Sequence, residues 1–247
     1  LLQAKKSLDA AIRLNPWASA YFGLYAYIFL DEREYRQALE KANAGLNIYA
    51  EDLTCLNARS QALFRLKQHD DAYDTIREAL AANPEDDFTH TNYGWHFLEK
   101  GKHKEALSHF TEALRINPVN GRAKEGYKAA LKSKLPFYRW ILQFSLWMGH
   151  QEKIVRFGII IGIWLLVRVV AALGEDSPLK YLAFGVVALY MMFVLFSWLG
   201  NAFANLYLLF TKHGKLILSS SEKWSAVLVG VSILAGVSLF VLQFFFD

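Results

Sequence analysis

The chain has 247 residues, of which 54% are hydrophobic and 20% charged, and its formal net charge is +4. This length allows one large domain or two modest ones. The small basic excess does not indicate a nucleic-acid partner, because much of it flanks apolar runs. The single cysteine, Cys55, excludes an internal disulfide framework and multi-cysteine zinc sites.

The two halves of the chain differ in character. Residues 1–134 are rich in both signs of charge, whereas residues 135–247 hold scattered charges among long apolar runs. We therefore expect a helical-repeat domain over residues 1–135 and a separate apolar domain after it. Because the chain starts without Met inside a repeat-like phrase, we also expect residues before Leu1.

Three windows of equal length align without gaps in the first half: 19–52, 53–86 and 87–120. Their position 20 is always alanine, in Ala38, Ala72 and Ala106. Small residues at fixed positions let two helices approach closely, and a single pair cannot bury its apolar face alone, so pairs stack. The pattern predicts one antiparallel helix pair per window, a partial repeat over 1–18 and a solvating cap helix over 121–135.

The third window carries Tyr93, Gly94, Phe97, Ala106 and Phe110, followed by the phrase ALRINP. This pattern resembles the tetratricopeptide-repeat (TPR) family, and the resemblance covers roughly residues 1–135. It implies an all-α solenoid that binds a protein partner on the inner face of the first helices. The residues that the family pattern places on this face are Tyr27, Asp31, Asn57, Gln61, Phe64, Arg65, Phe88, Thr91, Trp95 and Glu99.

Two qualifications apply to this groove. Phe88 and Trp95 have an alternative role as packing between adjacent repeats, because aromatic residues at helical spacing are usually core. Some chaperone-binding members of the family carry a clamp for a C-terminal carboxylate. Here Gly23, Tyr27 and Ala58 occupy three of the clamp positions, which disfavours that class of ligand.

Residues 136–151 have apolar side chains at spacings of three and four. This pattern predicts an amphipathic, Trp-rich interfacial helix, with packing against the last repeat as the alternative.

The apolar runs 154–173, 181–210 and 224–246 predict three transmembrane helices. Basic residues flank these runs on one side. We therefore expect an integral protein of a membrane, with bacterial inner membrane favoured, a cytoplasmic repeat domain and the C-terminus on the opposite side.

Several residues in these runs predict intramembrane packing. The small-residue pairs Gly158 and Gly162, Ala226 and Gly230, and Ser232 and Gly236 are each four residues apart, a spacing that brings helices together. Ser197, Asn201 and Asn205 share one helix face. Arg168 has two interpretations. Its side chain extends to the membrane surface, or it pairs with an anionic lipid or a second membrane subunit.

No catalytic, metal-binding or cofactor-binding motif occurs in the sequence, and each histidine is interpreted as structural. The leading hypothesis is a non-enzymatic, membrane-anchored adaptor or scaffold. Its repeats recruit a protein partner, and its membrane helices dock a second membrane subunit or another copy. The alternatives are a TPR-regulated transporter or membrane enzyme subunit, with a site near Arg168, Asn201 and Asn205, and a soluble chaperone cofactor with an apolar tail.

Overall fold

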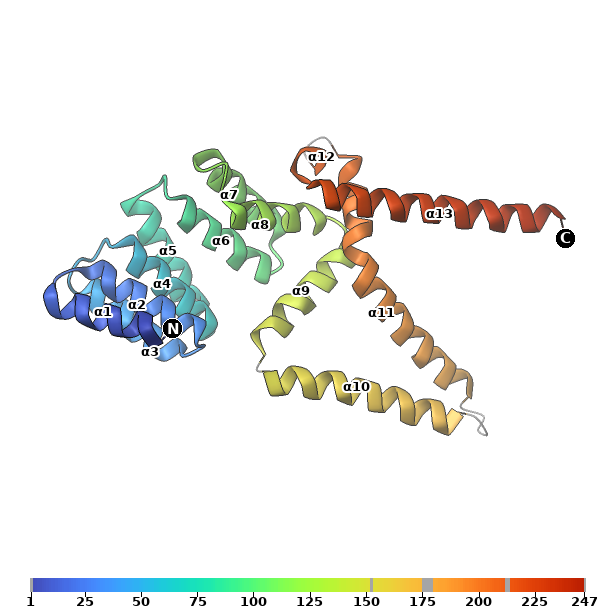
Figure 1. Ribbon diagram of the computed structural model, residues 1–247, viewed down its shortest axis with the longest axis horizontal. Helices are drawn as coiled ribbons and strands as arrows, with labels where there is room; N and C mark the ends of the chain where they lie inside the picture. The colour runs from blue at the N-terminus through green and yellow to red at the C-terminus, as the bar shows by residue number, and fades with distance from the viewer. Residues whose placement is uncertain (1, 152, 175–179, 212–213, 247) are drawn as a thin grey trace. The chain divides into compact units, whose positions relative to one another are not determined.

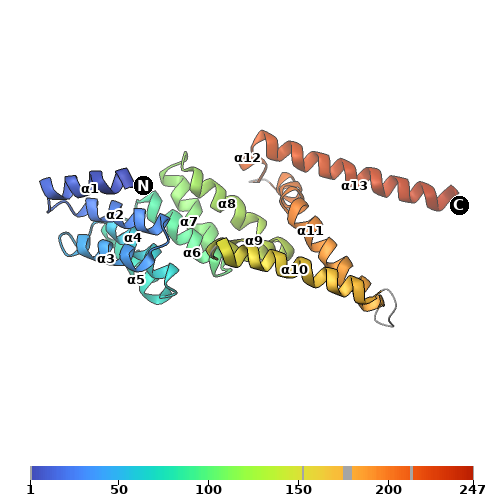
Figure 2. The same ribbon diagram turned by 60° about the horizontal axis from the view of Figure 1, so that its bottom comes forward.

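The computed structural model describes residues 2–151, 153–174, 180–211 and 214–246. Every regular element in these ranges is a helix, and the chain divides into two compact units. Unit 1 is Leu1–Tyr127 and unit 2 is Lys128–Asp247. Figures 1 and 2 show the helices of each unit.

Unit 1 is a stack of antiparallel helix pairs (Figure 1). The first helices of the pairs begin at Ser19, Leu53 and Asp87, which open the three predicted windows, and α8 begins at Gly121, where a fourth window of the same length would start. The helices are α1 (Leu2–Leu14), α2 (Ser19–Asp31), α3 (Tyr35–Leu46), α4 (Leu53–Arg65), α5 (His69–Ala82), α6 (Asp87–Glu99), α7 (His103–Ile116) and the first part of α8 (Gly121–Lys132), whose residues from Lys128 onward belong to unit 2. The predicted all-α, TPR-like solenoid is confirmed.

The repeat period also governs how the first helices start. The carboxylate of Asp52 accepts a hydrogen bond from the Cys55 amide at 2.9 Å, and that of Asp86 accepts one from the Thr89 amide at 2.7 Å. One period later, the side-chain oxygen of Asn120 accepts from a backbone amide of α8 at 2.9 Å. These caps satisfy amides that have no partner within the helix. The equivalent residue before α2 is Ala18, which has no capping side chain.

The turn inside each pair also recurs with this period. Arg33, Lys67 and Gly101 have φ values of 66°, 66° and 74°. In every case the amide of the next residue donates to a carbonyl five residues back, at 2.9 Å, which is the hydrogen bond that closes a Schellman motif. The left-handed residue therefore ends the first helix and turns the chain into the second.

The core of unit 1 is built from small residues. Ala38, Ala72 and Ala106 are 0% exposed, as the repeat pattern requires for close approach of helices. Ala4, which stands one period before Ala38, is exposed, and α1 contains no buried residue. The core therefore begins at α2, and α1 lies on its edge.

Unit 2 is organised around α11 (Lys180–Leu209), which contacts each of the other helices that lie wholly within the unit. Those helices are α9 (Pro136–His150), α10 (Lys153–Gly174), α12 (Gly214–Ile217) and α13 (Ser220–Phe246). Polar contacts also hold the unit. The Lys128 ammonium lies 2.9 Å from the Glu222 carboxylate, and the carbonyl oxygen of Asn201 accepts from Lys132 at 3.4 Å and from Tyr138 at 3.3 Å.

The expected membrane location is wrong. Helices do lie over the three apolar runs, but among the described residues none combines the length and the hydropathy that a bilayer crossing requires. The carbonyl oxygen of Asn201, within the second of these runs, accepts hydrogen bonds from Lys132 and Tyr138. The expected integral membrane protein, the favoured bacterial inner membrane, the cytoplasmic side of the repeats and the far-side C-terminus depended on these crossings and are withdrawn with them.

The residues predicted to pack inside a membrane have other environments. A Cβ atom at Gly158, Gly162 or Gly236 would meet nothing within 4 Å, whereas one at Gly230 would lie 3.2 Å from Leu206. The Arg168 guanidinium lies over the ring of Trp164, one turn earlier in α10, at 5.7 Å. Asn205 is 4% exposed, and its carbonyl oxygen has no donor among the described residues. The side chain of Ser197 lies outside the described residues.

Candidate peptide-binding groove

The first helices of the three full repeats bring several of the predicted groove residues into contact. Gln61 in α4 donates a hydrogen bond to the Tyr27 hydroxyl in α2 at 3.4 Å. The Tyr27 ring meets the ring of Phe88 in α6 edge to face, with centroids 6.0 Å apart. Beside them is a hollow of about 260 Å³, lined by Tyr27, Leu53, Thr54, Asn57, Asp86 and Phe88. Phe88 is 38% exposed, so an aromatic edge of this hollow faces solvent.

Asn57 forms the floor of this hollow. Its amide nitrogen donates to the Thr89 hydroxyl at 2.7 Å, and its carbonyl oxygen accepts from Asn92 at 2.9 Å. All three side chains are buried. A buried amide is costly unless both of its ends are hydrogen-bonded, and these bonds join α4 to α6. Asn57 therefore fixes α4 against α6 beneath the groove.

Thr91 is also buried, at 0% exposure, and does not line the open face. Its hydroxyl donates to the backbone carbonyl of Asp87 at 2.7 Å and accepts from the side-chain amide of Asn120 at 3.0 Å. The Asp87 carboxylate accepts from the same amide at 2.7 Å. Thr91 thus connects α6 to the start of α8.

A charged pair closes the other edge of the groove. The guanidinium of Arg65 in α4 lies 3.5 Å from the carboxylate of Glu99 in α6. The Glu99 side chain is 11% exposed, and burial raises its pKa, an effect that Arg65 and Arg122 partly offset. Burial makes the field of these charges stronger than it is at an open surface.

Phe64 is buried beneath this pair and belongs to the core. It stacks on the ring of His96 with centroids 4.0 Å apart and meets His69 edge to face at 4.7 Å. Burial first, and then the nearby Arg65 and Arg122 guanidiniums, lower the pKa of His96 to about 3. His96 is therefore neutral near pH 7 and packs as an aromatic side chain.

Trp95 and Asp31, also predicted to lie in the groove, differ in their exposure. Trp95 is half-buried and packs edge to face on Phe110 at 5.6 Å. Its indole N–H is buried without an acceptor among the described residues. Asp31, at the end of α2, is exposed. Trp95 thus follows the packing alternative in part, whereas Phe88 opens to solvent.

Arg122 belongs to the same face and was missed from the sequence. It stands one window length after Phe88, and Phe88 stands one window length after Thr54, so all three occupy position 2 of successive windows. Burial raises the pKa of Tyr27 in α2 and of Glu99 in α6, and the Arg122 guanidinium is among the charges that partly offset both effects. Interpreting residues 121–135 as a solvating cap alone concealed this contribution. Extending the repeat register by one more window would have found it.

Two histidines meet outside the groove. Nδ1 of His90 in α6 lies 3.1 Å from Nδ1 of His109 in α7, and Nε2 of His90 lies 3.1 Å from the backbone carbonyl of Pro84. Burial, and then His90, lower the pKa of His109 to about 4. The sequence compared histidines along single helices, so it did not bring these two together. In the described part of the chain, no three or more His, Cys, Asp or Glu side chains form a metal-binding group.

Cys55 offers no reactive thiol. Its side chain is 0% exposed, and its sulfur donates to the backbone carbonyl of Ser19 at 3.3 Å. Burial raises the pKa of the thiol to about 12. Because the thiolate is the nucleophilic and metal-binding form, Cys55 is a packing residue.

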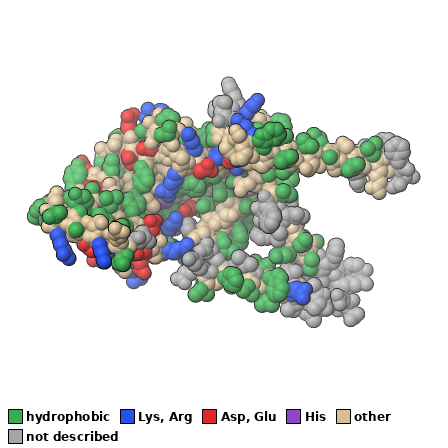
Figure 3. Space-filling view, in the orientation of Figure 1, with side chains coloured by type: hydrophobic (Ala, Val, Ile, Leu, Met, Phe, Trp, Pro, Cys, Tyr) green, Lys and Arg blue, Asp and Glu red, His purple; other side chains and the backbone are tan. Residues whose placement is uncertain are grey.

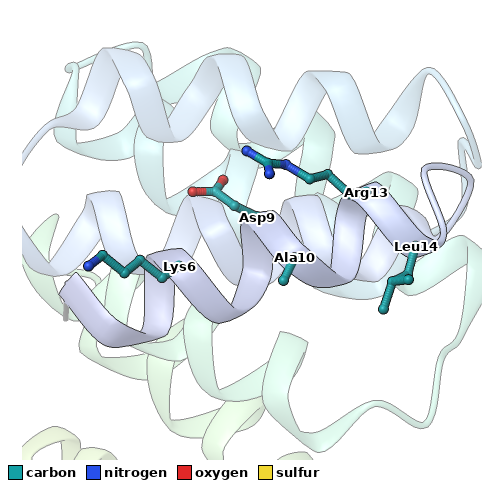
Figure 4. A pocket seen from close by; sticks show the side chains of 5 residues that line it. All are labelled: Lys6, Asp9, Ala10, Arg13 and Leu14. Atoms are coloured by element: carbon teal, nitrogen blue, oxygen red, sulfur yellow. The ribbon is translucent and has the colours of Figure 1, made fainter.

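A further hollow, of about 470 Å³, lies on α1 and is lined by Lys6, Asp9, Ala10, Arg13 and Leu14 (Figure 4). All five side chains belong to one helix, so this hollow brings together no residues from different elements. Over the face of unit 1 seen in Figure 3, acidic and basic side chains are interspersed.

Comparison with known proteins agrees with the repeat. Residues 89–120 match the family model described as tetratricopeptide repeat. Protein arginine N-methyltransferase 9 of Xenopus laevis is 30% identical over 122 residues, which cover 49% of this chain and 14% of that protein. The chain thus spans a small part of the length of this curated relative. The family model thus supports a tetratricopeptide repeat over residues 89–120, which lie within the third predicted window.

Two solved structures are similar to this chain. The first TPR domain of human RPAP3 has 18% identity and a TM-score of 0.46, covering 49% of this chain and 96% of that domain. PilF of Pseudomonas aeruginosa has 22% identity and a TM-score of 0.46, covering 74% of this chain and 80% of PilF.

Proposed function

We propose that the protein is a non-enzymatic adaptor that recruits a partner by binding an extended segment of it in the groove formed by α2, α4, α6 and the start of α8. Tetratricopeptide repeats typically serve as protein-interaction modules, and the geometry of unit 1 suits that role. The proposal assigns no catalytic step and no cofactor to the chain.

The observation that carries this proposal is the contact chain from Gln61 through Tyr27 to Phe88. It joins three helices along one face and leaves a hollow of about 260 Å³ beside an exposed aromatic edge. The hollow has room for an apolar side chain of the partner, and the hydroxyl and amide groups beside it can bond to a peptide backbone. A partly exposed aromatic residue beside fixed polar groups is typical of a protein-binding surface.

The floor is preorganised for such binding. The buried hydrogen bonds between Asn57, Thr89 and Asn92 fix α4 against α6 before any ligand arrives. A groove whose walls are already ordered loses little conformational entropy on association. The expected ligand is therefore the flexible partner, which becomes extended on binding.

The test is a display selection of short random peptides against the purified full chain, followed by fluorescence anisotropy with the selected peptides. We expect Gln61→Ala and Phe88→Ala to weaken binding by about tenfold each, because each removes one contact of about 1–1.5 kcal/mol. Arg36→Ala, on an exposed face of the second helix α3, is the matched control and should bind as the wild type does. Selected peptides that bind all four proteins equally would show that the groove is not the binding surface.

A further inference from the structure

We propose that His90 in α6 and His109 in α7 form a binding site for a divalent transition-metal ion of the Cu²⁺, Ni²⁺ or Zn²⁺ class, coordinated by the two Nδ1 atoms. The pair lies outside the groove, so this site does not depend on the proposed function. A bound ion would join the two helices of the third repeat.

The separation of the two nitrogens suits two ligands of one metal ion. His90 Nδ1 and His109 Nδ1 lie 3.1 Å apart, and the two ring centroids lie 5.4 Å apart. Imidazole nitrogens lie about 2.0–2.1 Å from a bound Zn²⁺. At that distance two nitrogens are about 2.9 Å apart for a right angle at the metal and about 3.4 Å apart for a tetrahedral angle. Small rotations of the rings would therefore direct both lone pairs at one ion.

The other nitrogen of His90 determines which ring atom can coordinate. His90 Nε2 lies 3.1 Å from the backbone carbonyl of Pro84, which can only accept, so we assign the ring hydrogen to Nε2. His90 Nδ1 therefore presents a lone pair, and His109 Nδ1 donates to it. A histidine that binds a metal commonly donates its other ring N–H to a backbone carbonyl, which orients the ring. His90 already has this arrangement.

Metal binding requires only a change of tautomer at His109. The hydrogen on Nδ1 is released to solvent, and Nε2 takes one up from solvent, which reaches this half-buried ring. Both histidines remain neutral, as metal ligands must be. The ion thus takes the place of the hydrogen that lies between the two Nδ1 atoms.

The surroundings of the pair hold His109 in place. Its ring lies against Tyr93 and Phe97 of α6, with centroids 4.4 Å and 5.5 Å away. Glu112, one turn further along α7, accepts a hydrogen bond from Arg115 at 2.8 Å and is not counted as a ligand. Since no group of three His, Cys, Asp or Glu ligands occurs among the described residues, water would complete the coordination.

This ligand set selects the class of ion. Imidazole suits Cu²⁺, Ni²⁺ and Zn²⁺, whereas Mg²⁺ and Ca²⁺ prefer oxygen ligands. For a given set of nitrogen ligands, Cu²⁺ binds more tightly than Ni²⁺ or Zn²⁺. Structural zinc sites have four protein ligands, whereas this pair supplies half that set. We therefore expect an ion that exchanges with solution.

The test is isothermal titration calorimetry of the purified full chain, without an affinity tag, against Cu²⁺, Zn²⁺ and Mg²⁺. We expect a saturable site for Cu²⁺, weaker binding of Zn²⁺ and no binding of Mg²⁺. His109→Gln and His90→Gln should each weaken Cu²⁺ binding by about tenfold or more, because each removes one of the two protein ligands. His103→Gln, at the start of the same α7 and outside the pair, is the matched control and should bind within about twofold of the wild type.

Electron paramagnetic resonance of the Cu²⁺ complex gives a readout that altered folding does not imitate. The wild type should show coupling to two imidazole nitrogens, and His109→Gln should lose it. Circular dichroism without metal checks that each variant is folded, and if His90→Gln is not, the half-buried His109→Gln decides. A wild type that binds neither Cu²⁺ nor Zn²⁺, unchanged affinity in His109→Gln, or an equal loss in His103→Gln would overturn the site and leave the proposed function untouched.

Discussion

Gly126 in α8 lies directly against the aromatic ring of Phe110 in α7. A Cβ atom at Gly126 would come within 2.2 Å of the ring, and one at Gly94 in α6 would come within 2.6 Å of it. Phe110 is 0% exposed, so the ring fills the space that the two glycines leave. Helices from the third repeat and from α8 thus close around one side chain.

This contact predicts that a single methyl group at either glycine destabilises unit 1. Gly126→Ala and Gly94→Ala should each lower the free energy of unfolding by about 1–3 kcal/mol, the usual cost of overpacking a dense core. Gly121→Ala, at the start of the same α8, meets nothing within 4 Å and is the matched control. Thermal unfolding of the full chain, followed by circular dichroism, would measure the differences. Equal melting temperatures for Gly126→Ala and Gly121→Ala would contradict the packing.

The sequence predicted part of this arrangement. Gly94 stands at a position where the repeat requires a small residue, so periodicity alone indicated close packing there. Gly126 does not stand at the corresponding position of the next window, which is Lys128. Its closeness to Phe110 depends on how α8 packs against the third repeat. Packing of the last helix of a repeat stack leaves no repeating pattern in the sequence.

The left-handed residues in the turns predict opposite effects of glycine and alanine. Gly101→Ala should lower stability by about 1 kcal/mol, because a Cβ atom is strained at positive φ. Lys67→Gly should raise stability by about 0.5 kcal/mol, since relief of this strain exceeds the added flexibility of the unfolded chain. Lys67→Ala keeps the strain and removes the charge, so it should give no gain. Urea unfolding of the full chain would measure all three, and a gain in Lys67→Ala would assign the effect to charge.

The missing cap before α2 predicts a stabilising substitution. Ala18 already has the extended backbone of a cap residue, with φ −82° and ψ 91°. Ala18→Asp should therefore place a carboxylate where Asp52 and Asp86 stand in the next two repeats, and stabilise α2 by about 0.5–1 kcal/mol. Hydrogen exchange of the first amides of α2 would slow accordingly. Ala18→Val, which offers no acceptor, should leave their exchange unchanged or faster.

The sequence predicted which residues share the groove face, but not which of them are buried. The register placed Tyr27, Gln61 and Phe88 on one side of the stack, and they do meet there. It could not show that Asn57 and Thr91 turn their polar groups inward, because burial depends on neighbours one full repeat away in the chain. Hydropathy likewise suggested membrane crossings for the second half. It could not show the polar contacts that lysine and tyrosine side chains make with Asn201.

Because His96 is buried in its neutral form, we expect unit 1 to become less stable in acid. Its pKa in the folded protein is about 3, below the ordinary value of 6.5, so the unfolded chain binds one more proton between these values. The free energy of unfolding should therefore fall as the pH drops below about 6.5, by roughly 1.4 kcal/mol per pH unit from this residue. This loss of stability from His96 is absent above pH 7 and reaches its full size near pH 3.

The variant His96→Phe distinguishes the effect of protonating His96 from the effects of other titrating groups. Phenylalanine can stack on Phe64 as the imidazole does, and the Nδ1 of His96 has no partner among the described residues to lose. Between pH 7 and 5, where few carboxylates titrate, the variant should show a flatter stability profile than the wild type. His109, whose pKa is lowered to about 4, should supply part of the slope that persists, so His96→Phe combined with His109→Gln should be flatter still. Denaturant unfolding at a series of pH values would test this, and parallel profiles for wild type and His96→Phe would exclude His96 as the source of acid sensitivity.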